Sequence, residues 1–158
     1  MRAWVGLGGN TGDPVATLRA AFTAIATLPQ TKLLRQSSLY RTPAWGPVPQ
    51  PDYINAVCLI ETELDAGELL AGLLDIEHAF GRQRRERWGP RSLDLDVLLY
   101  GDAIIDVPGL RVPHPHLHER AFMLVPLLEV DPQVSIPAIG GAREALAALA
   151  SGGIEVVG

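Results

Sequence analysis

Two aspartates lie two residues apart in the apolar run Ser92-Leu93-Asp94-Leu95-Asp96-Val97-Leu98-Leu99-Tyr100. Side chains alternate along a strand, so both carboxylates project from one face, with their Cα atoms roughly 7 Å apart. We expect that face to continue through Leu98 and Tyr100. Such a pair suits Mg²⁺, which binds one or two carboxylates and completes its shell with water and phosphate oxygens. A solvated strand face is the alternative, although aspartate is disfavoured in strands, and the pair alone leaves both interpretations open.

A basic loop precedes the aspartates. Five of the 13 Lys and Arg residues lie between Arg82 and Arg91. Arginine makes planar, bidentate contacts with phosphate oxygens, and the flanking Gly81, Gly89 and Pro90 predict a lid-like loop. The alternatives are a solvated basic loop or an arm that binds RNA, in which Trp88 stacks on a base.

The acidic pair and the basic loop are complementary. A bare triphosphate beside Asp94 and Asp96 would be repelled, by about 4 kcal/mol per pair of unit charges at about 4 Å and an effective dielectric near 20. A divalent cation between them reverses the sign of that interaction, and the arginines neutralise the remaining oxygens. This combination indicates phosphoryl transfer, in which positioning and charge stabilisation provide nearly all of the catalysis.

The surrounding elements predict how these residues are held. Strands are expected at 2–7, 32–40, 53–63 and 93–100, with a shorter strand at 103–106 returning beside the last of them. Helices are expected after the caps Asp13-Pro14 and Asp65-x-x-Glu68, at 119–130 with a kink or late start at Pro126, and at 142–150. An edge strand is expected at 154–157. The order strand, helix, strand, strand, helix, strand predicts an α/β (α+β) ferredoxin-like sandwich, in which helices cover a mainly antiparallel sheet.

Composition limits the classes of protein. A chain of 158 residues with a net charge of −5 predicts one domain over 1–158 and argues against a surface built for nucleic acid or anionic membrane. The single cysteine, Cys58, excludes an intrachain disulfide. No stretch approaches the roughly 20 apolar residues of a membrane helix, and no leader is visible. We therefore expect a cytoplasmic monomer without nucleic-acid or membrane partners.

Two further patterns are discounted. Gly6-Leu7-Gly8-Gly9-Asn10-Thr11-Gly12 lacks the dinucleotide spacing, and no Gly-Lys-Ser/Thr follows it as in a P-loop. His114, His116 and His118 alternate, but neighbouring prolines make the segment irregular, and acidic or cysteine partners are missing. We interpret the first pattern as a tight turn, and of the histidines we retain His114 alone.

Four blocks together resemble the hydroxymethyldihydropterin pyrophosphokinase family, over about Gly6 to Pro132. They are Tyr40-Arg41-Thr42-Pro43, Pro51-Asp52-Tyr53-Ile54-Asn55-Ala56, Arg87-Trp88-Gly89-Pro90-Arg91-Ser92-Leu93-Asp94-Leu95-Asp96 and Val112-Pro113-His114-Pro115. The third block is highly specific. The resemblance implies transfer of pyrophosphate from ATP to the hydroxymethyl group of 6-hydroxymethyl-7,8-dihydropterin in folate biosynthesis, with release of AMP.

The resemblance also implies roles for individual residues. Asp94 and Asp96 would hold two Mg²⁺ ions with ATP, and together with Arg82 and Arg91 they would form the catalytic set. On the nucleotide side, the implied residues are Glu77, Arg84, Trp88, His114 and Arg120. For the reduced pterin alcohol, they are Thr42, Pro43, Trp45, Tyr53, Asn55 and Phe122.

Two other functions fit parts of the sequence. A ferredoxin-like RNA-binding module would use the arginine loop and Trp88, and its affinity would fall steeply with salt. A sensor would bind nucleotide or pterin without releasing AMP.

Overall fold

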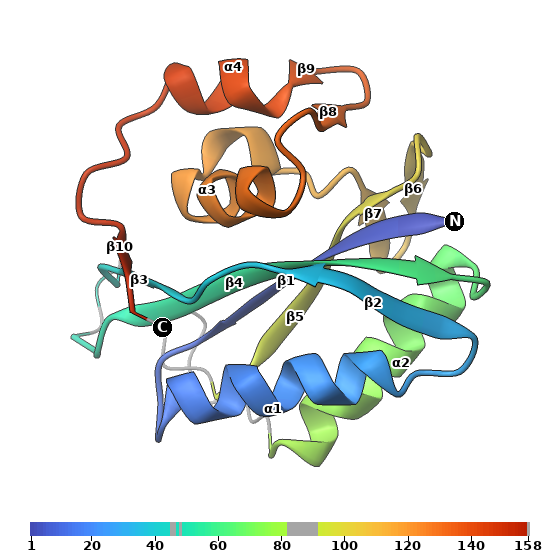
Figure 1. The fold of residues 1–158 in the computed structure, drawn as a ribbon, viewed down its shortest axis with the longest axis horizontal. Coiled ribbons are helices and arrows are strands. Elements are labelled where there is room, and N and C mark those ends of the chain that lie inside the picture. Colours follow the sequence, from blue (N-terminus) through green and yellow to red (C-terminus); the bar gives the residue numbers. More distant parts are fainter. Residues whose placement is uncertain (45–46, 48, 82–91, 158) are drawn as a thin grey trace.

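The computed structural model describes residues 1–44, 47, 49–81 and 92–157. Among these residues, six strands form one antiparallel sheet in the order β10-β3-β4-β1-β5, with β2 also pairing with β4 (Figure 1). The strands are β1 (Arg2–Gly9), β2 (Thr31–Gln36), β3 (Tyr40–Thr42), β4 (Tyr53–Thr62), β5 (Asp94–Tyr100) and β10 (Glu155–Val156). With β2 and β3 taken together as the second strand, this is the predicted ferredoxin-like arrangement.

Two helices cover one face of the sheet. Helix α1 (Pro14–Ala26) begins where Asp13 accepts a hydrogen bond from Ala16 N, and α2 (Ala66–Ala79) begins with the predicted capping box of Asp65 and Glu68. Their buried side chains join alternate residues of β1, β4 and β5 in one apolar core, including Leu18, Phe22, Leu69 and Leu73. Both predicted helices are confirmed.

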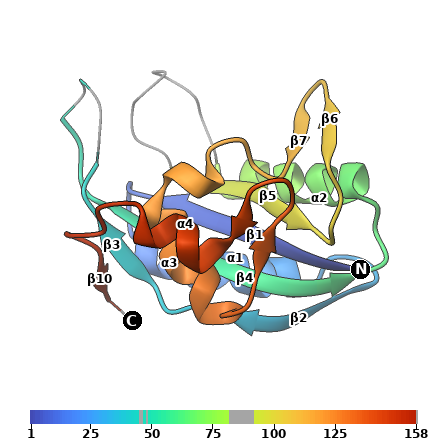
Figure 2. The same cartoon turned by 90° about the horizontal axis from the view of Figure 1, so that it is seen from above.

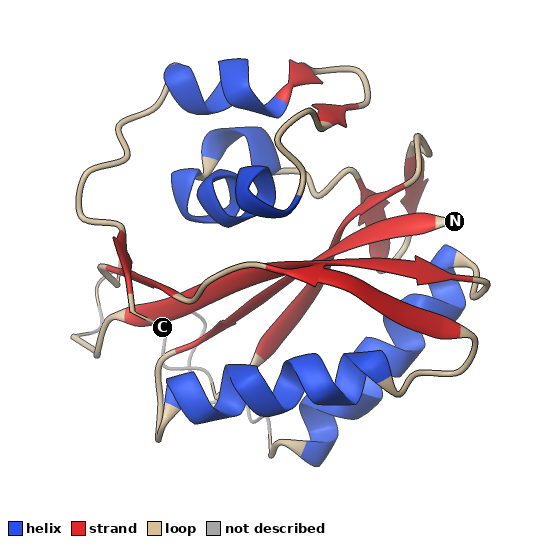
Figure 3. Ribbon diagram, in the orientation of Figure 1, coloured by secondary structure: helices blue, strands red, loops and turns tan. Residues whose placement is uncertain are grey.

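A second layer covers the opposite face, as Figure 3 shows. It contains the 3₁₀ turn η1 (Leu117–Glu119), α3 (Ala121–Val130), the short strands β8 (Ser135–Ile136) and β9 (Gly140–Gly141), and α4 (Ala142–Ala147). Helix α3 begins later than its first expected residue and keeps Pro126 inside it. Trp4, Val57, Leu98, Leu124 and Leu127 form a separate core on this side. Among the described residues, no helix is long and apolar enough to cross a bilayer.

A bulge in β5 changes which face its side chains occupy. Trp4 of β1 pairs with Leu99, but Val5 pairs with Val97, so Leu98 is the extra residue. Leu98 and Leu99 therefore both join the α3-side core, whereas Tyr100 packs against the core on the α1 and α2 side. The expectation that the aspartate face continues through Tyr100 is wrong for this reason.

The expected strand at 32–40 is divided into β2 and β3. Between them, Ser37 N donates to Val57 O at 2.8 Å, and Val57 N donates to Ser37 Oγ at 2.9 Å. A side-chain oxygen thus replaces a backbone acceptor, which interrupts the ladder. Glu129 of α3 accepts hydrogen bonds from Ser38 N, Ser38 Oγ and Tyr40 Oη, so this break is tied to the second layer.

The expected strand at 103–106 does not return beside β5. Instead, β6 (Ile105–Val107) pairs with β7 (Leu110–Val112) in a separate hairpin that turns at Gly109, where φ is 83°. Two backbone groups of β5 already have other partners. Leu95 N donates to the Glu77 carboxyl group at 2.6 Å, and Leu98 O accepts from His114 N at 2.9 Å.

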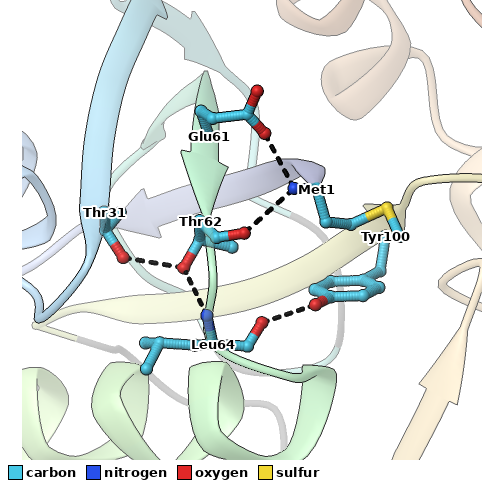
Figure 4. Close-up of polar contacts among 6 residues, drawn as sticks. All are labelled: Met1, Thr31, Glu61, Thr62, Leu64 and Tyr100. Carbon is cyan, nitrogen blue, oxygen red and sulfur yellow. Dashed lines mark hydrogen bonds and ion pairs between the residues drawn. The ribbon is translucent and has the colours of Figure 1, made fainter.

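Polar contacts join the strands at the end of the sheet where β5 finishes (Figure 4). The Met1 amino group donates to Thr62 O at 3.0 Å and lies 2.8 Å from the Glu61 carboxylate, which lowers the pKa of Glu61. Thr62 Oγ1 bonds with Thr31 Oγ1 and accepts from Leu64 N, and Tyr100 Oη donates to Leu64 O at 2.5 Å. The aspartates lie at the opposite end of β5.

Candidate active site

Asp94 and Asp96 are half-buried on the α3 side of the sheet, opposite two glycines of β1. Asp94 pairs with Gly8, and Asp96 pairs with Gly6. A Cβ atom on Gly8 would lie 2.9 Å from Asn55 Oδ1, and one on Gly6 would lie 3.2 Å from a Leu98 methyl group. Glycine therefore gives the carboxylates a neighbouring strip of sheet without side chains, which lets other groups approach the backbone.

A cavity of about 610 Å³ lies over this strip, and we call it the sheet cavity. Its floor comes from β1, β4 and β5, and its walls include the start of α3, the residues that follow β3, and the C-terminal segment. It brings together eight residues predicted for the site, namely Thr42, Pro43, Tyr53, Asn55, Asp94, Asp96, Arg120 and Phe122. Residues from four separate parts of the sequence thus meet at one place.

The amide of Asn55 has a fixed orientation in the sheet cavity. Asn55 is buried, and its Nδ2 donates to Thr42 Oγ1 at 2.8 Å. The Oδ1 atom consequently faces the Gly8 backbone, which has no side chain in the way. On the other wall, the Arg120 guanidinium lies over the Phe122 ring, 5.8 Å from its centroid. An aromatic face, an amide and an aromatic phenol therefore line a space suited to a flat polar ring.

A second cavity, of about 550 Å³, lies between β5 and the β6–β7 hairpin, and we call it the hairpin cavity. Its lining is mainly apolar, with Leu70 of α2 and residues 107–110, while Asp106, Arg111 and His114 contribute polar groups. Asp96 lines both cavities. A molecule in one cavity and a molecule in the other would therefore meet at this carboxylate.

His114 is held in a neutral form within the hairpin cavity. Its Nδ1 accepts a hydrogen bond from His116 N at 3.1 Å, so Nε2 carries the ring proton and is the donor left for a ligand. Burial lowers the pKa of His114 to about 4, and the nearby charges of Arg120 and His116 add to this effect. The backbone bond from His114 N to Leu98 O attaches this residue to the bulge of β5.

The remaining predicted residues fall into two groups. Glu77 is only 3% exposed on α2, where it accepts a hydrogen bond from Leu95 N, and it is not among the described residues that line the two cavities. Its predicted contact with the nucleotide stays a prediction. Arg82, Arg84, Trp88 and Arg91 of the basic loop, and Trp45, lie outside the described residues.

The donor atoms present fit magnesium better than zinc. In the described part of the chain, no group of three or more His, Cys, Asp and Glu residues could hold a metal ion. Zinc sites need three or four protein ligands, whereas Mg²⁺ needs one or two carboxylates and takes its other oxygens from water and phosphate. Asp94 and Asp96, on one face and at a cavity, supply that kind of partial site.

Sequence reasoning missed two contributions to these cavities. The apolar hairpin residues and Leu70 look like ordinary core or turn residues in the sequence, and only their position beside Asp96 distinguishes them. Ala150, Gly152 and Ile154 of the C-terminal segment line the sheet cavity, although their sequence contains no recognisable motif.

Comparisons with known proteins identify the family of this chain. The family model described as 7,8-dihydro-6-hydroxymethylpterin-pyrophosphokinase (HPPK) matches residues 4–132. The chain is 43% identical, over 98% of its length and 95% of the relative's, to a 2-amino-4-hydroxy-6-hydroxymethyldihydropteridine pyrophosphokinase of Pseudomonas aeruginosa. It is 46% identical to the enzyme of that name from Methylorubrum extorquens, over 99% and 98% of the two chains.

Solved structures share the fold at much lower identity. A crystal structure of Plasmodium falciparum HPPK-DHPS with pteroate matches with a TM-score of 0.75 at 13% identity. The match covers 93% of this chain and 44% of the Plasmodium chain, so the protein spans less than half of that larger chain. The family model and the two near full-length relatives lead to one conclusion: this chain belongs to the 7,8-dihydro-6-hydroxymethylpterin-pyrophosphokinase family.

Proposed function

We propose that this protein transfers a pyrophosphoryl group from Mg-ATP to the hydroxymethyl group of 6-hydroxymethyl-7,8-dihydropterin and releases AMP, as a step of folate biosynthesis. The observation that carries the proposal is that Asp96 lines two adjacent cavities. One cavity is suited to a flat polar ring and the other to a nucleotide, so the reacting groups would meet at the carboxylate pair.

The sheet cavity would hold the pterin alcohol. The Tyr53 and Phe122 rings line it and would contact the faces of the bicyclic ring. Asn55, fixed by its bond to Thr42, would hydrogen-bond the polar edge of the ring. Because Asp94 and Asp96 line the same cavity, the hydroxymethyl group would extend from the ring toward them.

The hairpin cavity would hold the nucleotide. Its apolar lining around Leu70 and Leu110 suits an adenine base, and His114 Nε2–H is a neutral donor for a phosphate oxygen. Arg82 and Arg91, which the family resemblance assigns to phosphate contacts, would approach from the basic loop.

The reaction exchanges one P–O bond for another and releases one proton. The hydroxymethyl oxygen attacks the β-phosphorus, the bond from that phosphorus to the α,β-bridging oxygen breaks, and AMP leaves with the bridging oxygen, while the hydroxyl proton passes to solvent. Bound magnesium would offset charge on the triphosphate and the leaving oxygen. Asp94 and Asp96 would hold the magnesium, and the walls of the two cavities would align the two reactants. Positioning and charge stabilisation of this kind are most of what a loose transition state requires.

The test follows the fate of the phosphates. Incubation with γ-labelled ATP, Mg²⁺ and the pterin alcohol should yield labelled pterin diphosphate and AMP in equal amounts. Formation of ADP would indicate transfer of the terminal phosphate alone and would contradict the proposal. Binding without turnover would indicate a sensor, and salt-sensitive RNA binding without turnover would indicate an RNA-binding module.

Asp96→Asn provides the matching variant. It keeps the side-chain size but removes the charge, so kcat/KM should fall by about 100-fold or more, the scale on which one lost electrostatic contact in the transition state is felt. Asp102→Asn, at the exposed turn after β5, is the control and should leave kcat/KM unchanged. Equal kcat/KM values for Asp96→Asn and Asp102→Asn would contradict the assignment of Asp96 to the active site.

A further inference from the structure

The C-terminal segment 150–157, which we call the strap, joins the outer helical layer to the edge of the sheet. It leaves α4, passes the side of α3 and reaches β3, where it forms β10 (Figures 1 and 2). The family model ends at residue 132, so the strap lies outside the matched region. Its position beside the sheet cavity nevertheless connects it with the site.

Backbone bonds hold the strap to the short strand β3. Glu155 pairs with Arg41 and Val156 with Tyr40, and Val157 N donates to Leu39 O at 2.8 Å. Val157 is half-buried and packs against the core on the α1 and α2 side. Strand β3 is only three residues long, and it lies between β4 and the strap. The strap therefore supports the outer side of the strand that carries Thr42.

The strap also contacts the residue that follows β3. Gly153 has a φ of 86°, a conformation that favours glycine, and a Cβ atom built there would lie 3.4 Å from Pro43 Cγ. Ala150, Gly152 and Ile154 line the sheet cavity on the same side as Thr42 and Pro43. Within the described part of the chain, none of the strap residues lines the hairpin cavity.

We propose that the strap is a wall of the acceptor site and determines how tightly and how selectively the pterin alcohol is bound. The proposal rests on the proposed function, since it assigns the sheet cavity to that substrate. Ile154 provides apolar contact area, and Gly153 lets the backbone lie against Pro43, which keeps Thr42 and its bond to Asn55 in place. Altering the strap should therefore change acceptor binding and leave nucleotide binding intact.

The experiment compares two isoleucines. Ile154→Ala removes apolar contact from the cavity wall, so the Kd of the pterin alcohol should rise by about tenfold. Ile139→Ala makes the same substitution at a side chain that is 51% exposed and outside the linings of both cavities, and it should leave that Kd unchanged. Pterin fluorescence measures the Kd in the presence of Mg²⁺ and a non-hydrolysable ATP analogue.

A second pair tests the backbone contact independently. Gly153→Ala and Gly140→Ala both place a side chain at a positive φ, but only Gly153 lies against Pro43. Both variants should lose similar stability in thermal unfolding, whereas only Gly153→Ala should weaken acceptor binding. In turnover, Ile154→Ala should raise the KM of the acceptor more than it lowers kcat, and Ile154→Val should recover most of the loss.

Two outcomes would overturn the strap proposal. One is an unchanged acceptor Kd in both Ile154→Ala and Gly153→Ala. The other is an equal loss of acceptor and ATP-analogue binding, since that would indicate general unfolding. The experiment measures acceptor binding, so its result does not depend on which phosphoryl group the protein transfers. A wild-type protein that produces ADP, or does not bind the pterin alcohol at all, contradicts the proposed function instead.

Discussion

A single buried carboxyl group lies beneath the two aspartates of the candidate site. Glu77 reaches β5 from α2, on the opposite side of the sheet from the sheet cavity, and accepts a hydrogen bond from Leu95 N. Leu95 is the residue between Asp94 and Asp96, so this bond fixes the backbone from which both aspartates project. We therefore regard Glu77 as a positioning residue for the aspartate pair.

This role predicts a specific effect of substitution. Glu77→Leu leaves Leu95 N–H without this acceptor, which should lower the free energy of unfolding by about 1–3 kcal/mol and raise the Mg²⁺ concentration needed for half-maximal turnover. Glu77→Gln keeps an acceptor oxygen and should recover most of both losses. Asp75→Leu, at an exposed position of the same helix, is the control. If both leucine variants had the same stability and Mg²⁺ dependence, the positioning role would be wrong.

His114 predicts a pH dependence of stability. Burial lowers its pKa from the ordinary 6.5 to about 4, so the folded protein takes up the proton at a lower pH than the unfolded chain does. Above about pH 6.5 the ring is neutral in both states, and protonation of His114 does not reduce the free energy of unfolding. As the pH falls from 6.5 toward 4, the unfolded state gains a proton that the folded state does not, and stability is lost.

Urea unfolding at a series of pH values between 7 and 4.5 measures this effect. The wild-type protein should lose stability more steeply over this range than His114→Asn, which cannot take up the proton. An NMR titration of the His114 ring should have its midpoint near 4. Parallel stability curves for the two proteins would contradict the assignment.

Among the elements, β1 contributes to the site through two glycines, Gly6 and Gly8, which leave the sheet beside the aspartates free of side chains. Gly8→Ala would place a Cβ atom 2.9 Å from Asn55 Oδ1, so the amide must move and its 2.8 Å bond to Thr42 must lengthen. We expect acceptor binding to weaken by about tenfold, equivalent to the loss of one buried hydrogen bond, with ATP-analogue binding unchanged.

A glycine in α2 is the control for this prediction. At Gly67 a Cβ atom would meet Asp65 Oδ1 at an ordinary 3.5 Å. Gly67→Ala should leave both affinities unchanged and stabilise the helix by up to about 1 kcal/mol. Calorimetry with the acceptor and with the ATP analogue compares the two variants, and an unaltered acceptor affinity in Gly8→Ala would refute the prediction.

The same elements illustrate how far local sequence patterns determine structure. Strand alternation correctly predicted that Asp94 and Asp96 share a face, because that rule depends only on neighbouring residues. The rule failed at Tyr100, since the bulge at Leu98 adds a residue that alternation cannot anticipate. The helix caps at Asp13 and Asp65 were predictable for the same local reason.

For the whole molecule, the order of elements was sufficient to predict a mainly antiparallel sheet covered by helices. The order of elements was not sufficient to predict strand pairing that depends on hydrogen bonds from residues distant in the sequence. The β6–β7 hairpin is separate from β5, whose Leu95 and Leu98 backbone groups bond to Glu77 and His114. The pterin-side residues Tyr53, Asn55 and Phe122 were predicted from the family resemblance, and their convergence in one cavity comes from the fold.

The strap bears on the selectivity of inhibitors. A compound that copies only the flat pterin ring contacts Tyr53, Asn55 and Phe122, which belong to the segment that the family model matches. A compound with a substituent that reaches Ile154 also contacts a surface beyond residue 132. If the strap is a wall of the acceptor site, the affinity of such a compound depends on the side chain at position 154 as well as on the ring-binding residues. Ile154→Ala should therefore weaken its binding more than that of a compound that copies the pterin ring alone.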